Sequence, residues 1–188
     1  MRAAIAPWER AQLQAWLRLS LTPSIGNAAA RRLLAHFGSA PAIFEACTTE
    51  LQACVSVAQA AQLRHPPEGF EQAFETTWQW LHAGTQEVAH ALVTLGDPRY
   101  PEGLLHTADP PLMLYVLGAP RWLNQAGALL AWQRSLAIVG SRNPTPQGAD
   151  NAFEFARHLA CQGWSVVSGM ALGIDAAAHE GALAAGSS

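Results

Sequence analysis

The sequence contains no lysine, and all 11 of its basic residues are arginine. Its 14 acidic residues bring the net charge to −3, so the chain as a whole does not attract a polyanion. A nucleic acid would have to be held by a local group of arginines and backbone N–H groups. The composition therefore excludes the strongly basic proteins that bind nucleic acid through net charge alone.

Long apolar runs and paired cysteines are missing as well. No stretch of about 18 apolar residues occurs, so we expect no membrane-spanning helix. The N-terminal segment carries charge and has no continuous apolar run, which is typical of the start of a domain rather than of a signal peptide. Cys47, Cys54 and Cys161 form no CxxC pair and have no histidine at ligand spacing. We expect reduced thiols in a cytoplasmic protein, with no metal site and no cofactor.

Residues 1–84 have the apolar spacing of helices. The clearest stretch runs from Asn27 to Phe37, where apolar side chains recur at i, i+3, i+4 and i+7 before Gly38 supplies a stop. Ser39 is placed to cap a further short helix. This pattern predicts a small all-helical domain over residues 1–84. We expect its four tryptophans to be buried: they are Trp8, Trp16, Trp78 and Trp80.

Residues 85–188 change to a β-rich pattern. Short β-like runs come first, at Ala91–Leu95 and Leu112–Leu117. The order strand, helix, strand, helix then predicts parallel βαβ pairing with a right-handed crossover. Those four segments are expected at Leu136–Val139, Pro146–Cys161, Trp164–Val167 and Ile174–Ala185. A sheet of this type has more strands than these, so we expect residues 85–188 to form the N-terminal part of an incomplete sheet.

Both parallel strands end in residues suited to phosphate. Gly140-Ser141-Arg142 follows the first strand and Ser168-Gly169 follows the second, and such ends lie side by side in a parallel sheet. Backbone N–H groups, hydroxyls and a guanidinium are donors that phosphate accepts. The first run is not GxGxxG, so the dinucleotide fingerprint is not met. The predicted phosphate contacts are Ser141, Arg142, Ser168, Gly169 and Gly173, and the alternative for Arg142 is a surface salt bridge.

Asp175 and His179 lie one helical turn apart, so their side chains can meet. One interpretation is a catalytic Asp–His pair. The favoured one is a helix-capping aspartate beside a packed histidine, because no nucleophile stands at a partner position. We therefore assign no catalytic residue.

The segment Leu21–Leu34 resembles a helix-hairpin-helix, in which N–H groups of the turn face a DNA phosphate. Gly26, Arg31 and Arg32 are the secondary DNA contacts that this interpretation predicts. A simple pair of antiparallel helices with a solvated arginine pair is slightly favoured over it. Tyr100 and Trp122 could likewise stack on bases, although packing at the junction between the two domains is favoured for them.

Four ordered segments together resemble the DNA-processing protein A (DprA/Smf) family, with matching order and spacing over residues 90–183. They are Val93–Pro101, Asp109–Gly118, Ala137–Arg142 and Val167–Leu183. The helical first part is similar to the SAM-like or helix-hairpin-helix domain of that family. The resemblance implies an α/β protein with that N-terminal domain followed by an extended Rossmann-like sheet.

The resemblance also implies a function. Members of the family are cytoplasmic, bind and protect single-stranded DNA, and load the RecA recombinase on it during natural transformation. They are homodimers at full length and are not enzymes. Carried over by motif, Ser141 and Arg142 would contact phosphate, with Ser168, Gly169 and Gly173 lining the same pocket.

Two other functions stay open. An enzyme of a related Rossmann-like fold could bind or hydrolyse a nucleoside monophosphate at this pocket. It would need a carboxylate near the sugar, for which Asp175 and Glu180 are the candidates. The chain could otherwise be an interaction module, whose helical domain docks a partner.

Overall fold

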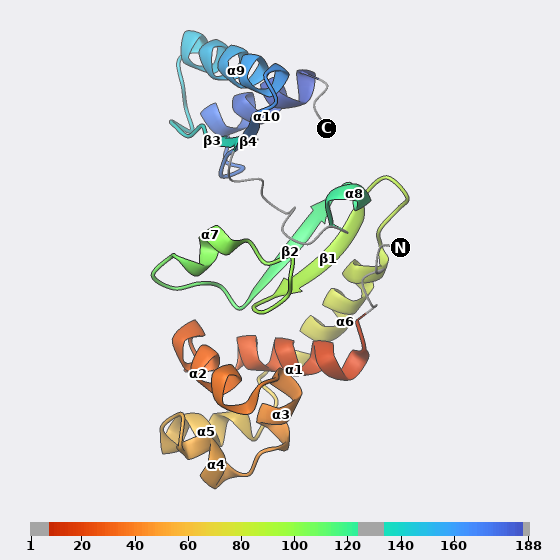
Figure 1. Ribbon diagram of the computed structural model, residues 1–188, viewed down its shortest axis with the longest axis vertical. Coiled ribbons are helices and arrows are strands. Elements are labelled where there is room, and N and C mark those ends of the chain that lie inside the picture. The colour runs from red at the N-terminus through yellow and green to blue at the C-terminus, as the bar shows by residue number, and fades with distance from the viewer. Residues whose placement is uncertain (1–7, 124–133, 186–188) are drawn as a thin grey trace. The chain divides into compact units, whose positions relative to one another are not determined.

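The computed structural model describes residues 8–123 and 134–185 (Figure 1). Its packing divides the chain into two compact units, Met1–Leu129 and Leu130–Ser188. Both units combine helices with a small two-stranded sheet, so the predicted mixture of helix and strand is confirmed.

The first unit begins with short helices. They are α1 (Arg10–Leu21), α2 (Asn27–Phe37), α3 (Ala40–Glu45), α4 (Thr48–Gln52), α5 (Val57–Leu63) and α6 (Phe70–His82). Their ends follow local signals in the sequence. Gly38 ends α2 with φ of 79°, a left-handed conformation that glycine adopts without strain. The hydroxyl of Ser39 accepts the Ala42 N–H at 3.4 Å and so caps α3.

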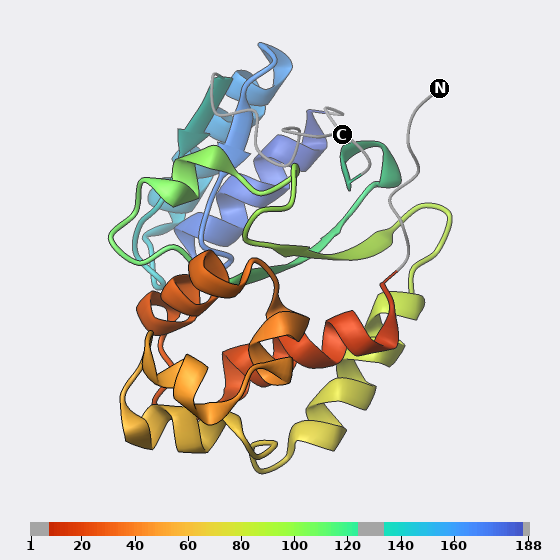
Figure 2. The ribbon, with the colours of Figure 1, turned by 60° about the horizontal axis from the view of Figure 1, so that its bottom comes forward.

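A two-stranded antiparallel sheet completes the first unit. Strand β1 (Ala89–Thr94) pairs with β2 (Met113–Gly118), in a register that runs from Ala89 opposite Gly118 to Thr94 opposite Met113. The short helices α7 (Glu102–Leu105) and α8 (Pro120–Leu123) flank β2 in sequence. Within this unit α1 lies between the sheet and helices α3 to α5 (Figure 2).

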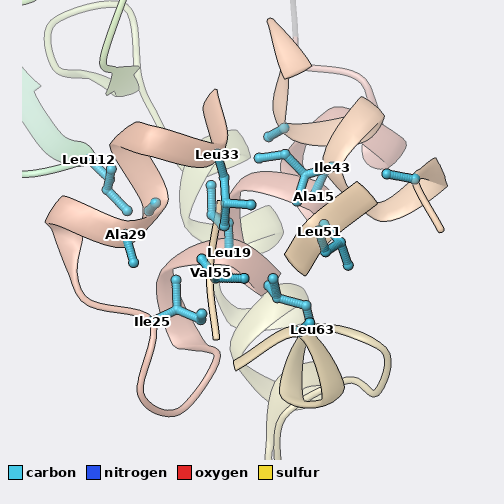
Figure 3. Packing of buried hydrophobic residues seen from close by; sticks show 14 residues of the cluster. Ala15, Leu19, Ile25, Ala29, Leu33, Ile43, Leu51, Val55, Leu63 and Leu112 are labelled. Atoms are coloured by element: carbon cyan, nitrogen blue, oxygen red, sulfur yellow. The ribbon is translucent and has the colours of Figure 1, made fainter. Parts of the chain in front are cut away.

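Strand residues take part in the helical core of this unit. Leu92 of β1 is fully buried in a cluster with Leu13, Leu17, Phe70 and Phe74. Leu112, just before β2, joins the larger cluster and lies beside Ala29 of α2 (Figure 3). The sheet therefore contributes to the cores that the helices form.

This packing explains why the compact units do not follow the expected boundary between residues 84 and 85. The sheet lies on the far side of that boundary in sequence, yet Leu92 and Leu112 bury their side chains among helices of residues 1–84. The first unit consequently extends to Leu129. The assignment of residues 1–84 and 85–188 to two domains stays a prediction.

The second unit has the expected order of strand, helix, strand and helix. Its elements are β3 (Ser135–Ala137), α9 (Pro146–Cys161), β4 (Ser165–Val167) and α10 (Ile174–Ala184). Strands β3 and β4 pair in parallel, from Ser135 opposite Ser165 to Ala137 opposite Val167, which confirms the predicted pairing. Each strand has three residues and ends shortly before a glycine, which is Gly140 after β3 and Gly169 after β4.

The two helices of this unit approach each other closely. A Cβ placed on Gly181 of α10 would lie 2.1 Å from the carbonyl oxygen of Phe153 in α9. The buried residues of the two helices include several alanines, which are small: Ala152, Ala156 and Ala160 of α9 and Ala178 of α10. Backbones meet at this distance only when one side has no side chain, so Gly181 sets the spacing of α9 and α10.

Replacing Gly181 with alanine should therefore destabilise the second unit. The added methyl group meets main-chain atoms that cannot rotate away, and we expect the free energy of unfolding to fall by about 1–3 kcal/mol. Urea denaturation followed by far-UV circular dichroism measures the change. Gly118→Ala is the control, because a Cβ there meets nothing within 4 Å. Equal stability of the two variants would contradict the proposed role of Gly181.

Candidate nucleic-acid interface

The ends of β3 and β4 lie together, as the sequence predicts. The Ser168 hydroxyl donates to the Ile138 carbonyl at 2.7 Å, and the Ile138 N–H donates to the Val167 carbonyl at 3.0 Å. The Ile174 N–H donates to the Ser141 carbonyl at 3.1 Å. These bonds join the segment after β3 to the segment that leads from β4 into α10.

Two glycines let these segments approach. A Cβ on Gly140 would lie 2.8 Å from Cγ1 of Ile174. Gly173 has φ of 85°, and a Cβ there would lie 2.3 Å from the Ser141 carbonyl oxygen. Gly140 therefore makes room for the side chain of Ile174, and Gly173 makes room for the backbone of Ser141 and Arg142. For Gly173 this contact is a sufficient explanation without a ligand.

Asp175 accepts hydrogen bonds from the loop that precedes its own helix. Its Oδ2 atom receives the N–H of Gly169 at 3.0 Å and that of Ala171 at 3.4 Å, and the residue is 6% exposed. Burial alone would raise the pKa of Asp175. Hydrogen bonds from Ala171, Gly169, Ser168 and Gly140 favour the charged form more strongly, so its pKa is lowered.

This arrangement corrects the favoured interpretation of Asp175 as a cap of α10. The N-cap residue of α10 is Gly173, and Asp175 lies inside the first turn. Its carboxylate binds N–H groups of the preceding loop rather than free N–H groups of the helix. The sequence indicated that the Asp175 carboxylate would accept hydrogen bonds. It could not show that the donors are N–H groups of the loop before α10.

The same arrangement limits the predicted phosphate contacts. The Gly169 N–H already has an anion as its acceptor. The Ser168 hydroxyl lies near both the Ile138 carbonyl and Asp175, and its single hydrogen serves one of them at a time. In this structure neither group faces an unfilled anion site.

Arg142 and Ser141 differ from the other predicted contacts. Arg142 is exposed, and within residues 8–123 and 134–185 its guanidinium has no ion pair or hydrogen bond, so the salt-bridge alternative finds no support there. The Ser141 hydroxyl accepts the Asn143 N–H at 3.1 Å and keeps its own hydrogen to donate. An unpaired guanidinium and a hydroxyl that keeps its hydrogen can each donate to a phosphate from solvent.

His179 gives no support to a catalytic Asp–His pair. The known partners of the Asp175 carboxylate are N–H groups and a hydroxyl. The Nε2 atom of His179 is buried and has no hydrogen-bond partner in the part of the chain that the structure describes. In a catalytic pair the aspartate would be hydrogen-bonded to the histidine that takes up the proton. No such bond joins Asp175 and His179 in the described part of the chain.

The segment that resembles a helix-hairpin-helix joins α1 to α2. Gly26 is the exposed N-cap residue of α2. The Arg31 guanidinium pairs with Asp109 at 2.9 Å and donates to the Pro110 carbonyl at 2.8 Å, so it ties α2 to the segment before β2. Arg32 is exposed and donates to the Cys54 carbonyl at 3.3 Å. Arg31 thus has a structural role in the first unit, and Arg32 is the more accessible of the pair.

Tyr100 is used for packing rather than for stacking. It is 7% exposed, and its hydroxyl donates to the Pro111 carbonyl at 2.7 Å. Its ring is therefore not available to a base in solution.

Comparison with known proteins identifies the family. The model of the family described as DNA recombination-mediator protein A matches residues 91–188. The chain belongs to this family. The resemblance found in the sequence motifs is confirmed, and the matched residues include all of the second unit, strand β2 and most of β1.

Individual relatives agree with this assignment. The DNA processing protein DprA of Bacillus subtilis is 32% identical over 93 residues, which are 50% of this chain and 29% of the relative. Protein Smf of Escherichia coli is 31% identical over 169 residues, which are 89% of this chain and 40% of the relative. The chain thus spans at most about two fifths of the length of these curated relatives.

A solved structure has a similar fold. The X-ray structure of DNA processing protein A from Streptococcus pneumoniae superimposes with a TM-score of 0.57 and 19% identity. The match covers 96% of this chain and 56% of that one. Among the described residues, no helix is long and apolar enough to span a bilayer. The same residues contain no group of three or more side chains arranged to hold a metal ion.

The role of Asp175 can be tested through pH. Asp175→Asn removes the charge that the loop N–H groups bind, so we expect a lower denaturation midpoint than wild type at about pH 7. The folded pKa lies below the unfolded value of about 3.9, so the stabilisation is complete above that value and is lost as the pH falls through the folded pKa. The difference between the two proteins should therefore shrink by about pH 3.

Urea titrations at both pH values measure this difference. Asp150→Asn is the control, since Asp150 is an exposed residue on α9 of the same unit. A deficit of Asp175→Asn that stays the same at both pH values would show that the charge of Asp175 is not what stabilises the loop.

Proposed function

We propose that this protein binds single-stranded DNA, with Arg142 and Ser141 as phosphate contacts at the ends of β3 and β4. The supporting observation is the exposed guanidinium of Arg142, which pairs with none of the described residues, in a chain of the DNA recombination-mediator family. In the whole protein, this binding would serve DNA processing: protection of the strand and loading of the RecA recombinase during natural transformation.

The local charges of the second unit favour Arg142 over Arg157. Arg157, which is also exposed, is already paired with Glu154 at 2.6 Å on the surface of α9. A DNA phosphate would have to displace that carboxylate from Arg157, whereas at Arg142 it displaces only water and counterions. This difference makes Arg142 the stronger candidate in a chain of negative net charge.

The proposal includes the finer description of the fold. The helices α1 to α6 would form a SAM-like or helix-hairpin-helix domain, and the parallel pair β3–β4 would be the start of an extended Rossmann-like sheet. A homodimer and a RecA contact are proposed for the whole protein, since this chain spans at most about two fifths of the length of its curated relatives. We propose a cytoplasmic location on the same grounds.

We propose a binding protein rather than an enzyme that hydrolyses nucleoside monophosphates. Such an enzyme needs a carboxylate that is free to act near the sugar. Asp175 is nearly buried and bonded to the loop, and its pKa is lowered rather than raised toward neutral pH. Glu180 is exposed on α10, and none of the described residues bonds to its carboxylate to orient it toward a sugar.

The test is fluorescence anisotropy of a labelled oligo-dT strand with wild type and Arg142→Ala across a range of salt concentrations. Loss of one phosphate contact on a single strand should reduce the slope of log K against log salt by about 0.7. At low salt we expect affinity to fall about tenfold, since a charge-assisted hydrogen bond is lost.

Two variants serve as controls. Arg142→Lys keeps the charge but loses the two-pronged donor, so it should keep the salt slope with a smaller loss of affinity. Arg157→Ala removes an arginine that is already neutralised by Glu154 and should bind like wild type. If Arg142→Ala and Arg157→Ala bind DNA equally well, Arg142 is not the phosphate contact.

A further inference from the structure

The first unit contains an open cleft of about 570 Å³. Helix α1, the junction between α2 and α3, and the loop that follows β1 form its walls. Two tryptophans line it, Trp8 just before α1 and Trp16 within the helix. The phosphate contacts proposed above lie in the other unit, so this cleft is a separate feature.

The two indole rings are held in place and still reach the cleft. Trp8 packs against the cluster of Leu13 and Phe74, and its Nε1–H donates to the Leu92 carbonyl at 3.3 Å. Trp16 packs against the larger cluster of the first unit. Both rings are only partly buried, in contrast to the burial expected from the sequence. A ring that is fixed by its core contacts loses little entropy when a flat ligand stacks on it.

The opposite wall carries no net charge. Asp97 and Arg99 form a bidentate pair, from Nε to Oδ1 at 2.9 Å and from Nη2 to Oδ2 at 2.6 Å, and the Arg99 N–H also donates to Oδ1 at 2.8 Å. Burial alone would raise the pKa of Asp97, but these bonds from Arg99 lower it, so the carboxylate stays ionised and paired. Among the described residues that line the cleft, no other side chain is charged.

These features define the chemistry of a ligand. A phosphate or a carboxylate would find no free cation in the cleft, so an anionic group does not fit. An uncharged aromatic ring can stack on an indole face, and sequence-tolerant stacking of this kind is how single-stranded DNA binders hold bases. Gln12, one helical turn before Trp16 on α1, also lines the cleft and offers an amide donor and acceptor to polar edges.

We propose that this cleft binds bases of single-stranded DNA, stacked on Trp8 and Trp16, with the Gln12 amide bonded to a base edge. The inference rests on the proposed function, because the bases belong to the same kind of strand whose phosphates Arg142 would contact. Stacking on a neutral surface releases few counterions, so this part of the affinity depends little on salt.

The experiment compares two labelled strands of equal length, oligo-dT and a strand made of abasic nucleotides. Both have the same phosphates, and only the first has bases. Trp16→Ala should bind oligo-dT about 5- to 150-fold more weakly than wild type, while its affinity for the abasic strand and its salt slope stay unchanged. Trp80→Ala, at a tryptophan outside this cleft, should bind both strands like wild type.

A second variant guards against loss of folding, because Trp16 also contacts the core. Gln12→Glu places an unpaired carboxylate in the cleft from an exposed position and should weaken binding of oligo-dT more than of the abasic strand. Gln79→Glu adds the same charge at an exposed position on α6 and should affect both strands equally.

The outcomes separate this inference from the proposed function. If wild type binds oligo-dT and both cleft variants bind it equally well, the cleft does not hold bases, and the role of Arg142 stands or falls on its own test. Parallel weakening on oligo-dT and the abasic strand would also overturn the inference, since it would mean a contact with the backbone. If the unchanged protein binds neither strand, the proposed function and the inference both fail for this chain.

Discussion

The second unit depends on one buried carboxylate. Backbone N–H groups of Gly140, Gly169 and Ala171 all favour the ionised form of Asp175, and two of them are bonded directly to Oδ2. Clustered N–H groups at strand ends are the usual setting for a bound phosphate. Here the chain supplies its own anion, which joins the ends of β3 and β4 to the start of α10. In the proposed function, a DNA phosphate would therefore be bound by the outer groups, Ser141 and Arg142.

Glycine contacts place those outer groups. The missing Cβ of Gly173 leaves room for the main chain of Ser141 and Arg142, whose nearest atoms would lie 2.3 to 2.8 Å from a side chain there. At the other end of α10, Gly181 allows the same close approach to Phe153 of α9. The helix is thus held at both ends by backbone contact. The position of Arg142 therefore follows from the packing of α10, and not only from the strand that precedes it.

The sequence predicted what depends on local signals. The bounds of α2 and α9 were correct, because Gly38 stops the first and the Thr145 hydroxyl caps the second by accepting the Gly148 N–H. Contacts between distant segments could not be read in this way. The partners of Asp175 come from a loop that folds back, and Leu112 joins a helical core that its own neighbours in sequence do not indicate. Trp8 and Trp16 fit the pattern of core residues, and only the packed structure shows that both also line a cleft.

Net charge limits how a protein of this composition can hold DNA. With −3 overall and no lysine, it cannot rely on a broad positive surface. Several of its arginines are already occupied: Arg31 by Asp109, Arg99 by Asp97 and Arg157 by Glu154. An arginine that is neutralised inside the fold adds nothing to phosphate affinity, and a single phosphate contact at Arg142 would by itself give weak binding with a shallow salt dependence. Stacking in a neutral cleft needs no positive charge. The two proposed contacts are thus complementary, because one would bind the backbone of the strand and the other would bind its bases.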